Sequence, residues 1–218
     1  MSLQIDVISD VVCPWCLIGK RHLEAALALY CEAHPDEPKP TGNWRPFELH
    51  PHLPPEGVER RDYVAQKFGG PERAAAIYQR VADAGLAAGI QFDFAKIGRQ
   101  PNTRDAHRLI RYAQRAGFGD AVVEALFRSF FLEAGDLTDP RHLAAIGSQC
   151  GADASAILDY LNGDEDKEEV DEEERHARQR GVDGVPFFIF NQRYAVTGAQ
   201  PAPVLLDAML QAAGDSPL

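Results

Sequence analysis

Residues 5–16, with the sequence IDVISDVVCPWC, carry the strongest structural signal in this chain. The apolar residues at their start predict a buried strand over residues 3–9. Pro14 suits the first turn of a helix, because the N–H that proline lacks would have no partner there. Apolar residues then recur at helical spacing to about residue 33. The Cys-x-x-Cys motif therefore lies at the junction between a first strand and a first helix.

The two cysteines of this motif, Cys13 and Cys16, predict thiol–disulfide chemistry. A helix N-terminus carries about half a positive charge, which favours the thiolate, the species that attacks a disulfide. We expect Cys13, at the exposed start of the helix, to be the nucleophile. Cys16, one turn further along, is expected to be more buried and to resolve the mixed disulfide. This chemistry requires neither a metal nor an organic cofactor.

Composition narrows the classes of partner. The 218 residues suffice for one sizeable core, or for one core with an inserted subdomain. The formal net charge of −11 argues against a nucleic-acid partner, since phosphate backbones are bound by clustered Lys and Arg. No apolar run approaches the ~18 residues of a membrane span. The first residues lack the charged start and apolar stretch of a secretory signal, so we expect a cytoplasmic protein.

The rest of the chain changes character twice, which predicts an α/β fold with a large helical insertion. A second strand is expected over residues 43–49, completing a βαβ unit. Asp120 and Asp139 are expected to cap helix N-termini. Two short strands at 186–190 and 193–196 should close the sheet. The expected later helices cover residues 59–68, 71–88, 103–116, 119–132, 139–150, 153–162, 164–180 and 201–213.

Other residues that could be reactive or bind a ligand are expected to have structural roles. The acidic run at 164–174 is expected to be a solvated helix face. Cys31 and Cys150 have no paired spacing and are expected to be small buried hydrophobes. A structural zinc site that uses the Cys-x-x-Cys motif is disfavoured, because it would need two further ligands. Cys31 and Cys150 do not have the spacing of zinc ligands, and His50 and His52 are expected to be polar surface residues.

Three motifs, in this order, resemble the DsbA-like branch of the thioredoxin superfamily, and its FrnE-like cytoplasmic members most. They are Cys-Pro-Trp-Cys at 13–16, Gly-Val-Pro at 184–186 and Thr-Gly-Ala-Gln at 197–200. The resemblance covers essentially the whole chain. It implies a protein dithiol–disulfide oxidoreductase or isomerase.

The same resemblance implies a domain organisation and a site. A thioredoxin-like domain, with a βαβ and then a ββα unit, would be split between residues 1–55 and 181–218. An inserted helical domain would occupy residues 56–180. Pro186 would be in the cis form and face the cysteine pair, leaving the Val185 backbone free to pair with an extended substrate.

Further contacts are implied around the motif and by related families. Pro14 and Trp15 would shape the site, and Trp15 offers an apolar contact surface. Kappa-class glutathione transferases and 2-hydroxychromene-2-carboxylate isomerases share a helix start like residues 102–109, so Asn102 and His107 are candidates to contact substrate; a packed helix histidine is the alternative for His107. In the transferases, an Asp at the start of the last helix helps to hold glutathione, and this chain has Gln200 at that position. Glutathione is therefore a candidate co-substrate, and Gln200 is a candidate to contact it.

The chain departs from thioredoxin and DsbA at one position. Those proteins have a buried acidic residue six positions before the first cysteine that helps to move protons, and this chain has Val7 there. Asp6 and Asp10 flank it on the opposite face of the strand. Neither is assigned as a proton relay, and Asp10 is equally well interpreted as an exposed loop residue.

A second hypothesis is a glutathione-dependent transferase or isomerase acting on a small aromatic molecule. The relatives with that activity carry a serine at the position of Cys13 and lack the second cysteine, so the intact pair favours disulfide chemistry. The expected partner is a disulfide-containing protein or a small thiol. A homodimer is an open alternative, in which aromatic residues at 127–131 would serve an interface; the helical core is their default place.

Overall fold

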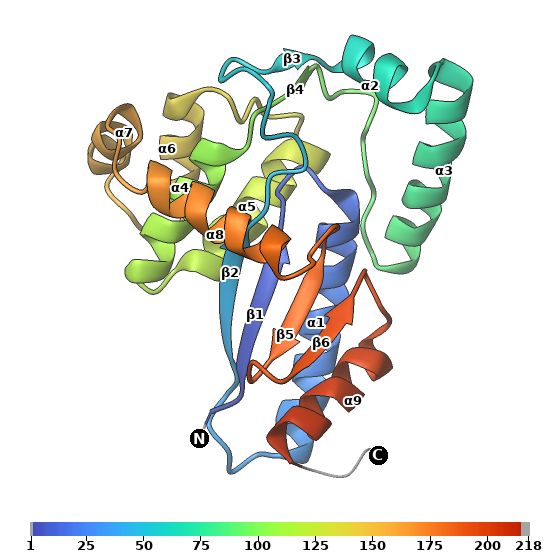
Figure 1. The fold of residues 1–218 in the computed structure, drawn as a ribbon, viewed down its shortest axis with the longest axis vertical. Helices are drawn as coiled ribbons and strands as arrows, with labels where there is room; N and C mark the ends of the chain where they lie inside the picture. The colour runs from blue at the N-terminus through green and yellow to red at the C-terminus, as the bar shows by residue number, and fades with distance from the viewer. Residues whose placement is uncertain (1, 215–218) are drawn as a thin grey trace.

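The computed structural model describes residues 2–214 and has the α/β architecture expected from the sequence (Figure 1). Within those residues, a mixed four-stranded sheet has the order β2-β1-β5-β6. β1 and β2 are parallel, whereas β5 is antiparallel to both of its neighbours. The strands span Gln4–Ser9 (β1), Thr41–Pro46 (β2), Phe187–Phe190 (β5) and Tyr194–Thr197 (β6).

Different helices cover the two faces of this sheet. Ile5 and Val7 of β1 belong to the main core, together with buried residues of α1 (Pro14–Ala33) and α9 (Ala202–Ala213). Ile8 points to the opposite face, because side chains alternate along a strand. There it packs with Phe47 and with Val182, in the segment that follows α8.

The helices between β2 and β5 form two groups (Figure 1). α2 and α3 arch over one side of the molecule, and α4 to α8 gather beside the β2 edge. None of the helices within residues 2–214 combines the length and the apolar character needed to cross a membrane. The bounds are Val58–Glu59 (β3), Arg60–Phe68 (α2), Pro71–Ala87 (α3), Arg99–Gln100 (β4), Arg104–Arg115 (α4), Gly119–Leu132 (α5), Pro140–Gln149 (α6), Ala154–Asn162 (α7) and Lys167–Gln179 (α8).

The second group of helices is joined to the sheet at Trp44 of β2. The Gln114 side chain of α4 accepts a hydrogen bond from the Trp44 N–H at 2.6 Å and donates one to the Trp44 carbonyl at 3.0 Å. The Trp44 indole donates to Asp120 of α5 at 3.2 Å. These bonds satisfy backbone groups that an edge strand would leave open, so α4 and α5 hold a fixed place beside the sheet.

Several expectations from the sequence are confirmed. The βαβ unit and the terminal ββα unit are present, with a run of helices between them. Asp139 caps α6 by accepting a hydrogen bond from the Arg141 N–H at 2.9 Å. The aromatic side chains Phe127, Phe130 and Phe131 are fully buried in the core, which was their expected default place.

Other expectations were wrong in position. The second strand spans residues 41–46 instead of 43–49, because after a last bond from the Phe47 N–H to the Ser9 carbonyl the Leu49 N–H binds the Asp10 carboxylate and not the sheet. α5 begins at Gly119, so Asp120 lies in its first turn and Phe118 is the N-cap residue. The β3–β4 ladder falls in a region where almost no strand was expected, since two-residue strands leave no periodicity to detect.

The acidic run is only in part a solvated face. Asp166 and Glu174 are each 6% exposed. Asp166 accepts hydrogen bonds from Arg111 of α4 and from Tyr160, and Glu174 accepts one from Arg178. The expectation of a solvated face was wrong for these two side chains, because neighbouring elements supply their partners.

Candidate active site

The Cys-Pro-Trp-Cys motif forms the start of α1. Cys13 is the N-cap residue, with an extended backbone and no side-chain cap bond. Its N–H donates to the Asp10 carbonyl at 3.0 Å, and the Cys16 N–H donates to the Cys13 carbonyl at 3.0 Å. The Cys13 sulfur therefore lies at the end of the helix where the dipole stabilises negative charge. Both cysteines are free thiols.

Both sulfur atoms are enclosed by the protein. Cys13 is 5% exposed and Cys16 is 1% exposed, so the order of burial is as expected but an exposed Cys13 is not found. The reason is the loop before β5: the Cys13 Sγ lies 3.6 Å from the Val185 carbonyl oxygen. Trp15, between the cysteines, is 41% exposed and is accessible to a partner.

The surroundings of Cys16 keep its proton in place. Burial raises the pKa of the Cys16 thiol well above its ordinary value, and the neighbouring Cys13 sulfur raises it further. The Ser9 hydroxyl and the Asp10 backbone act in the opposite direction. The Ser9 hydroxyl has no hydrogen bond of ordinary geometry, although it lies beside Cys16. Cys16 is therefore a neutral thiol near neutral pH.

The loop that carries Val185 packs directly on α1. The Val185–Pro186 peptide bond is cis, as the resemblance implied. Gly19 of α1 faces this proline, and a Cβ atom at Gly19 would come within 2.9 Å of Pro186 Cγ and 3.1 Å of Phe188 Cζ. The Gly198 N–H donates to the Pro186 carbonyl at 2.8 Å. The absence of a side chain at Gly19 lets the loop approach the cysteines.

A group of buried charged side chains lies next to the cysteine motif. Asp10 is fully buried, so it is not an exposed loop residue, because the chain after β2 covers it. Its carboxylate accepts hydrogen bonds from the N–H groups of Val12 at 3.4 Å and Leu49 at 2.8 Å. Its Oδ1 also lies 3.8 Å from Nε2 of His107 on α4. The structure thus joins residues from the start and the middle of the chain.

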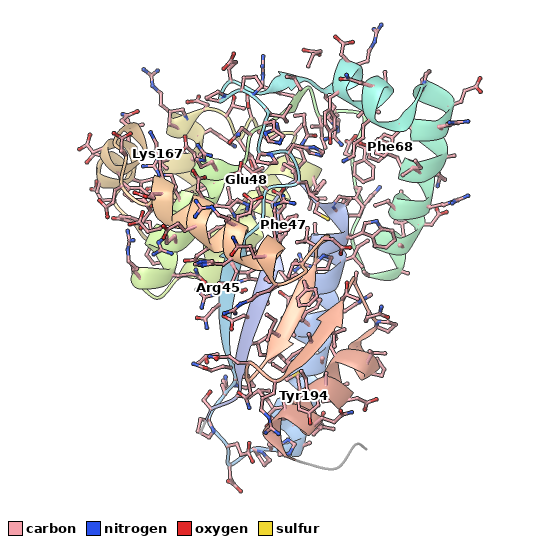
Figure 2. The ribbon with its side chains drawn as sticks, viewed as in Figure 1. Arg45, Phe47, Glu48, Phe68, Lys167 and Tyr194 are labelled. Atoms are coloured by element: carbon pink, nitrogen blue, oxygen red, sulfur yellow. The ribbon has the colours of Figure 1, made fainter. Side chains whose placement is uncertain are left out.

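Glu48 completes this group, and sequence reasoning missed it. Its side chain is 1% exposed, and neither of its carboxylate oxygens has a hydrogen-bond partner. The Nε of Arg104 is 3.7 Å away, while another nitrogen of Arg104 binds Asp171 at 2.7 Å. Burial raises the pKa of Glu48 to about 7, against the opposing effect of His107. Figure 2 labels Glu48 just beyond the end of β2 and close to α8.

His107 is 4% exposed, which agrees with a packed helix histidine rather than with one that lines an open cleft. Burial lowers its pKa, but Asp10 and then Glu48 raise it, and the net direction is upward. Its predicted contact with substrate stays a prediction.

Asn102 and Gln200 are occupied by local contacts. The Asn102 amide donates to the Leu53 carbonyl at 3.0 Å, and its oxygen accepts the Arg104 N–H at 3.0 Å. The exposed Gln200 side chain donates to the Thr197 carbonyl at 3.1 Å. The structure therefore gives both residues a role in shaping loops, and their predicted substrate contacts are untested.

α2 brings a cation toward the cysteine motif. Lys67 donates to Tyr63 Oη at 2.8 Å and to His50 Nε2 at 2.9 Å. Burial, and then Lys67, lower the pKa of His50 to about 4, so His50 is neutral and is not a simple polar surface residue. Burial lowers the pKa of Lys67, and the Cys13 sulfur acts in the opposite direction, so the ammonium group and this sulfur interact electrostatically.

The remaining cysteines and the candidate metal ligands form no second site. Within residues 2–214, no group of three or more His, Cys, Asp or Glu side chains is arranged to hold a metal ion. Cys31 and Cys150 are free thiols of intermediate exposure instead of buried ones, although Cys150 packs against the core as a small hydrophobic residue would.

The chain is similar in sequence and fold to known proteins. The structure of a probable DsbA oxidoreductase from Streptomyces coelicolor is 30% identical, with a TM-score of 0.86 over 99% of this chain and 92% of that one. The cytosolic disulfide reductase DsbM from Pseudomonas aeruginosa, solved with GSH, is 15% identical, with a TM-score of 0.59 over 97% and 96% of the two chains. The uncharacterized protein YwbO from Bacillus subtilis is 25% identical over 194 residues, 87% of each chain.

The family model described as a DSBA-like thioredoxin domain matches residues 4–210. That span runs from the first strand to the last helix and includes both the cysteine motif and the cis-proline loop. The likeness to the Streptomyces structure covers the same elements, and the DsbM structure shares the fold. The chain belongs to the DsbA-like thioredoxin family.

Proposed function

We propose that this protein is a thiol–disulfide oxidoreductase or isomerase that acts on its substrates through a mixed disulfide at Cys13. The observation that carries the proposal is the arrangement of three groups. The Cys13 sulfur stands at the start of α1, the Val185 carbonyl lies 3.6 Å from it, and the Cys16 thiol lies one turn further into the protein. Membership of the family supports an enzyme of this class.

The reaction follows from these positions. In the reducing direction, the Cys13 thiolate attacks a substrate disulfide, a bond forms between Cys13 Sγ and one substrate sulfur, and the other sulfur leaves as a thiolate. Cys16 then loses its proton and attacks Cys13 Sγ, and the second substrate thiolate leaves. Two electrons have passed to the substrate, and a Cys13–Cys16 disulfide remains. The reverse sequence oxidises a dithiol.

The substrate class is a disulfide-containing protein or a small thiol. An extended segment beside Val185 could form backbone hydrogen bonds while its disulfide meets Cys13. The exposed face of Trp15 offers an apolar contact next to that position. Glutathione is included among the proposed substrates because the DsbM structure, which shares the fold, was solved with GSH.

A glutathione-dependent transferase or isomerase acting on a small aromatic molecule is the competing function. The position of Cys16 argues against it, because a thiol one turn behind Cys13 would attack a glutathione adduct on Cys13. The substitution Cys13→Ser separates the two functions, since only the competing one is expected to survive it.

The test is to trap the intermediate. In a Cys31→Ser/Cys150→Ser background, the variant Cys16→Ala is incubated with glutathione disulfide and analysed by mass spectrometry. We expect a stable adduct on Cys13, and in the same background with Cys16 present we expect the adduct to give way to a Cys13–Cys16 disulfide. An adduct that persists equally in both proteins would contradict the proposal and favour the transferase.

The proposal also includes the domain organisation, the cellular location and the oligomeric state. We infer a thioredoxin-like domain from residues 1–55 and 181–218 and a helical domain from 56–180, supported by the run of helices between β2 and β5. A cytoplasmic location is supported by the description of DsbM as cytosolic. A homodimer is a prediction that light scattering of the full chain would test.

A further inference from the structure

A carboxylic acid lies fully buried beside the active-site loop with no hydrogen-bond partner for either oxygen. This acid is Glu48. A buried polar group without a partner is unfavourable, and in native proteins it calls for a specific explanation. The charged groups that face Glu48 are His107 and Arg104 from α4, Glu174 from α8, and Asp10 from the loop after β1. None of them donates a hydrogen bond to its carboxylate.

Two other buried polar side chains, His107 and Ser9, border one cavity. His107 Nε2 and Ser9 Oγ are also buried without hydrogen-bond partners. Both line a cavity of about 40 Å³, which exceeds the roughly 10–15 Å³ that one water molecule needs. The cavity is also lined by Arg45 and Glu173, whose side chains are partly exposed. One cavity, with polar and apolar walls, is therefore bordered by Ser9, which lies beside Cys16, by His107 and by partly exposed side chains.

We propose that Glu48 and His107 together exchange protons with Cys16 by way of Ser9 and this cavity, an inference that rests on the proposed thiol–disulfide function. Cys16 must lose its proton before it attacks Cys13, and Ser9 lies beside it. The oxygens of Asp10 already accept backbone N–H groups, which hold its carboxylate in place 3.8 Å from His107 Nε2. Glu48 and His107 act through Ser9 and are positioning residues rather than catalytic ones.

The electrostatics of the pair suit this role. A group exchanges protons most effectively when its pKa lies near the working pH. Burial brings the pKa of Glu48 to about 7. Burial lowers the pKa of His107, but Asp10 raises it, and the net direction is upward. Near neutral pH, the Glu48 carboxyl group is therefore close to half protonated and can accept or release a proton.

The proton and the electrons balance in each direction. When the substrate is reduced, the proton of Cys16 passes through Ser9 to the His107–Glu48 pair, the Cys16 Sγ–Cys13 Sγ bond forms, and the bond between Cys13 and the substrate breaks. The substrate leaves as a thiolate and takes a proton from solvent. The pair then releases the proton through the cavity that His107 lines. When a dithiol is oxidised, the proton returns to Cys16 by the same route.

The experiment uses the full chain in a Cys31→Ser/Cys150→Ser background, reduced and held in excess over 5,5′-dithiobis(2-nitrobenzoate). Cys13 releases the first thionitrobenzoate, and Cys16 releases the second when it attacks the mixed disulfide. Stopped-flow absorbance follows both phases between about pH 5 and about pH 9, a range that brackets the pKa of Glu48. The second phase reports the deprotonation of Cys16.

We expect the second phase to show an inflection near pH 7. Glu48→Gln should remove that inflection and slow the second phase at neutral pH by about tenfold or more, with the first phase unchanged. Glu48→Asp, which keeps an ionisable group, should retain an inflection. Glu124→Gln is the matched control, because it removes a carboxylate from an ion-paired cluster on α5 and should leave both phases unchanged.

The inference is overturned if Glu48→Gln leaves the second phase and its pH profile intact, or if it slows both phases equally. If the Glu48→Gln variant fails to fold, as judged by loss of its far-ultraviolet circular dichroism signal, Ser9→Ala provides an independent test. The Ser9→Ala variant must then slow the second phase and leave the first phase unchanged. Failure of the proposed function is distinguishable, since the wild-type protein would then retain the thionitrobenzoate adduct and show no second phase.

Discussion

Glu124 and Glu48 lie in two different charged clusters, and the fold treats their carboxyl groups in opposite ways. Glu124 sits on α5 and accepts hydrogen bonds from Arg21, which lower its pKa to about 2. Lys20, only 3% exposed on α1, lies 3.1 Å from the same carboxylate. Burial without a hydrogen-bond partner instead raises the pKa of Glu48 to about 7.

The difference separates a structural cluster from a candidate functional one. Paired charges of opposite sign hold α1 against α5, and every member has a partner. The group around Glu48 lies beside the cysteine motif and leaves polar atoms unpartnered, which lowers stability. Carboxyl groups with strongly perturbed pKa values cluster at functional sites, because catalytic groups need pKa values matched to their task. Stability should therefore respond to Glu→Gln with opposite sign in the two clusters.

The largest expected effect is a gain in stability from Glu48→Gln. The pKa of Glu48 is about 7 in the folded protein and about 4.3 in the unfolded chain, so the folded state binds the proton more tightly. The stability that this proton provides is fully present below about pH 4 and is lost as the pH rises to about 7. Glu48→Gln should therefore raise the unfolding free energy by about 3 kcal/mol at pH 8 and change it little at low pH. Urea unfolding at both pH values measures this.

A loss of stability from Glu48→Gln at pH 8 would mean that the charges of Arg104 and His107 stabilise the carboxylate by more than burial disfavours it. Glu48→Ala is no substitute for the test, because it adds the effect of a cavity to the removal of charge.

The second effect is smaller and has the opposite sign. Glu124→Gln should lower the unfolding free energy at pH 7 by about 1 kcal/mol, since it breaks a networked but partly exposed ion pair. The pKa of Glu124 is depressed to about 2, so its contribution is present above about pH 4.3 and is lost as the pH falls toward 2. Urea unfolding at pH 7 in low and high salt checks this, because screening should reduce the loss.

The smallest effect refines the account of Glu48. Glu174 raises the pKa of Glu48 through its own negative charge. Glu174→Gln should therefore move the midpoint of the Glu48 transition downward, by less than about one pH unit. The pH dependence of thermal unfolding measures the midpoint, and an upward movement would show that Glu174 acts on Glu48 mainly by another route.

The sequence was sufficient to predict the parts of the site that depend on local order. The Cys-Pro-Trp-Cys motif at the start of a helix and the cis bond before Pro186 are both present in the structure. Both rest on short motifs whose residues are neighbours in the chain. The run of helices between two halves of a sheet was also visible, because helical periodicity persists over long segments.

The charged group around Glu48 could not be found in this way. Asp10, Glu48 and His107 are far apart in the chain and meet only when β1, β2 and α4 pack together. The second strand was placed two residues late at its start and three residues late at its end, and nothing in the sequence marked Glu48 as buried. The enclosure of Cys13 depends on the approach of the Val185 loop, which is likewise a tertiary feature.

The central claim is that Cys13 and Cys16 form a reversible redox pair. The most direct measurement equilibrates the full chain in thiol–disulfide buffers and counts free thiols by alkylation and mass spectrometry. We predict one two-electron transition, with a disulfide between these two residues in the oxidised protein and none in a Cys16→Ala variant. A protein that accumulates only a glutathione adduct on Cys13, with Cys16 remaining a free thiol at every potential, would contradict the account.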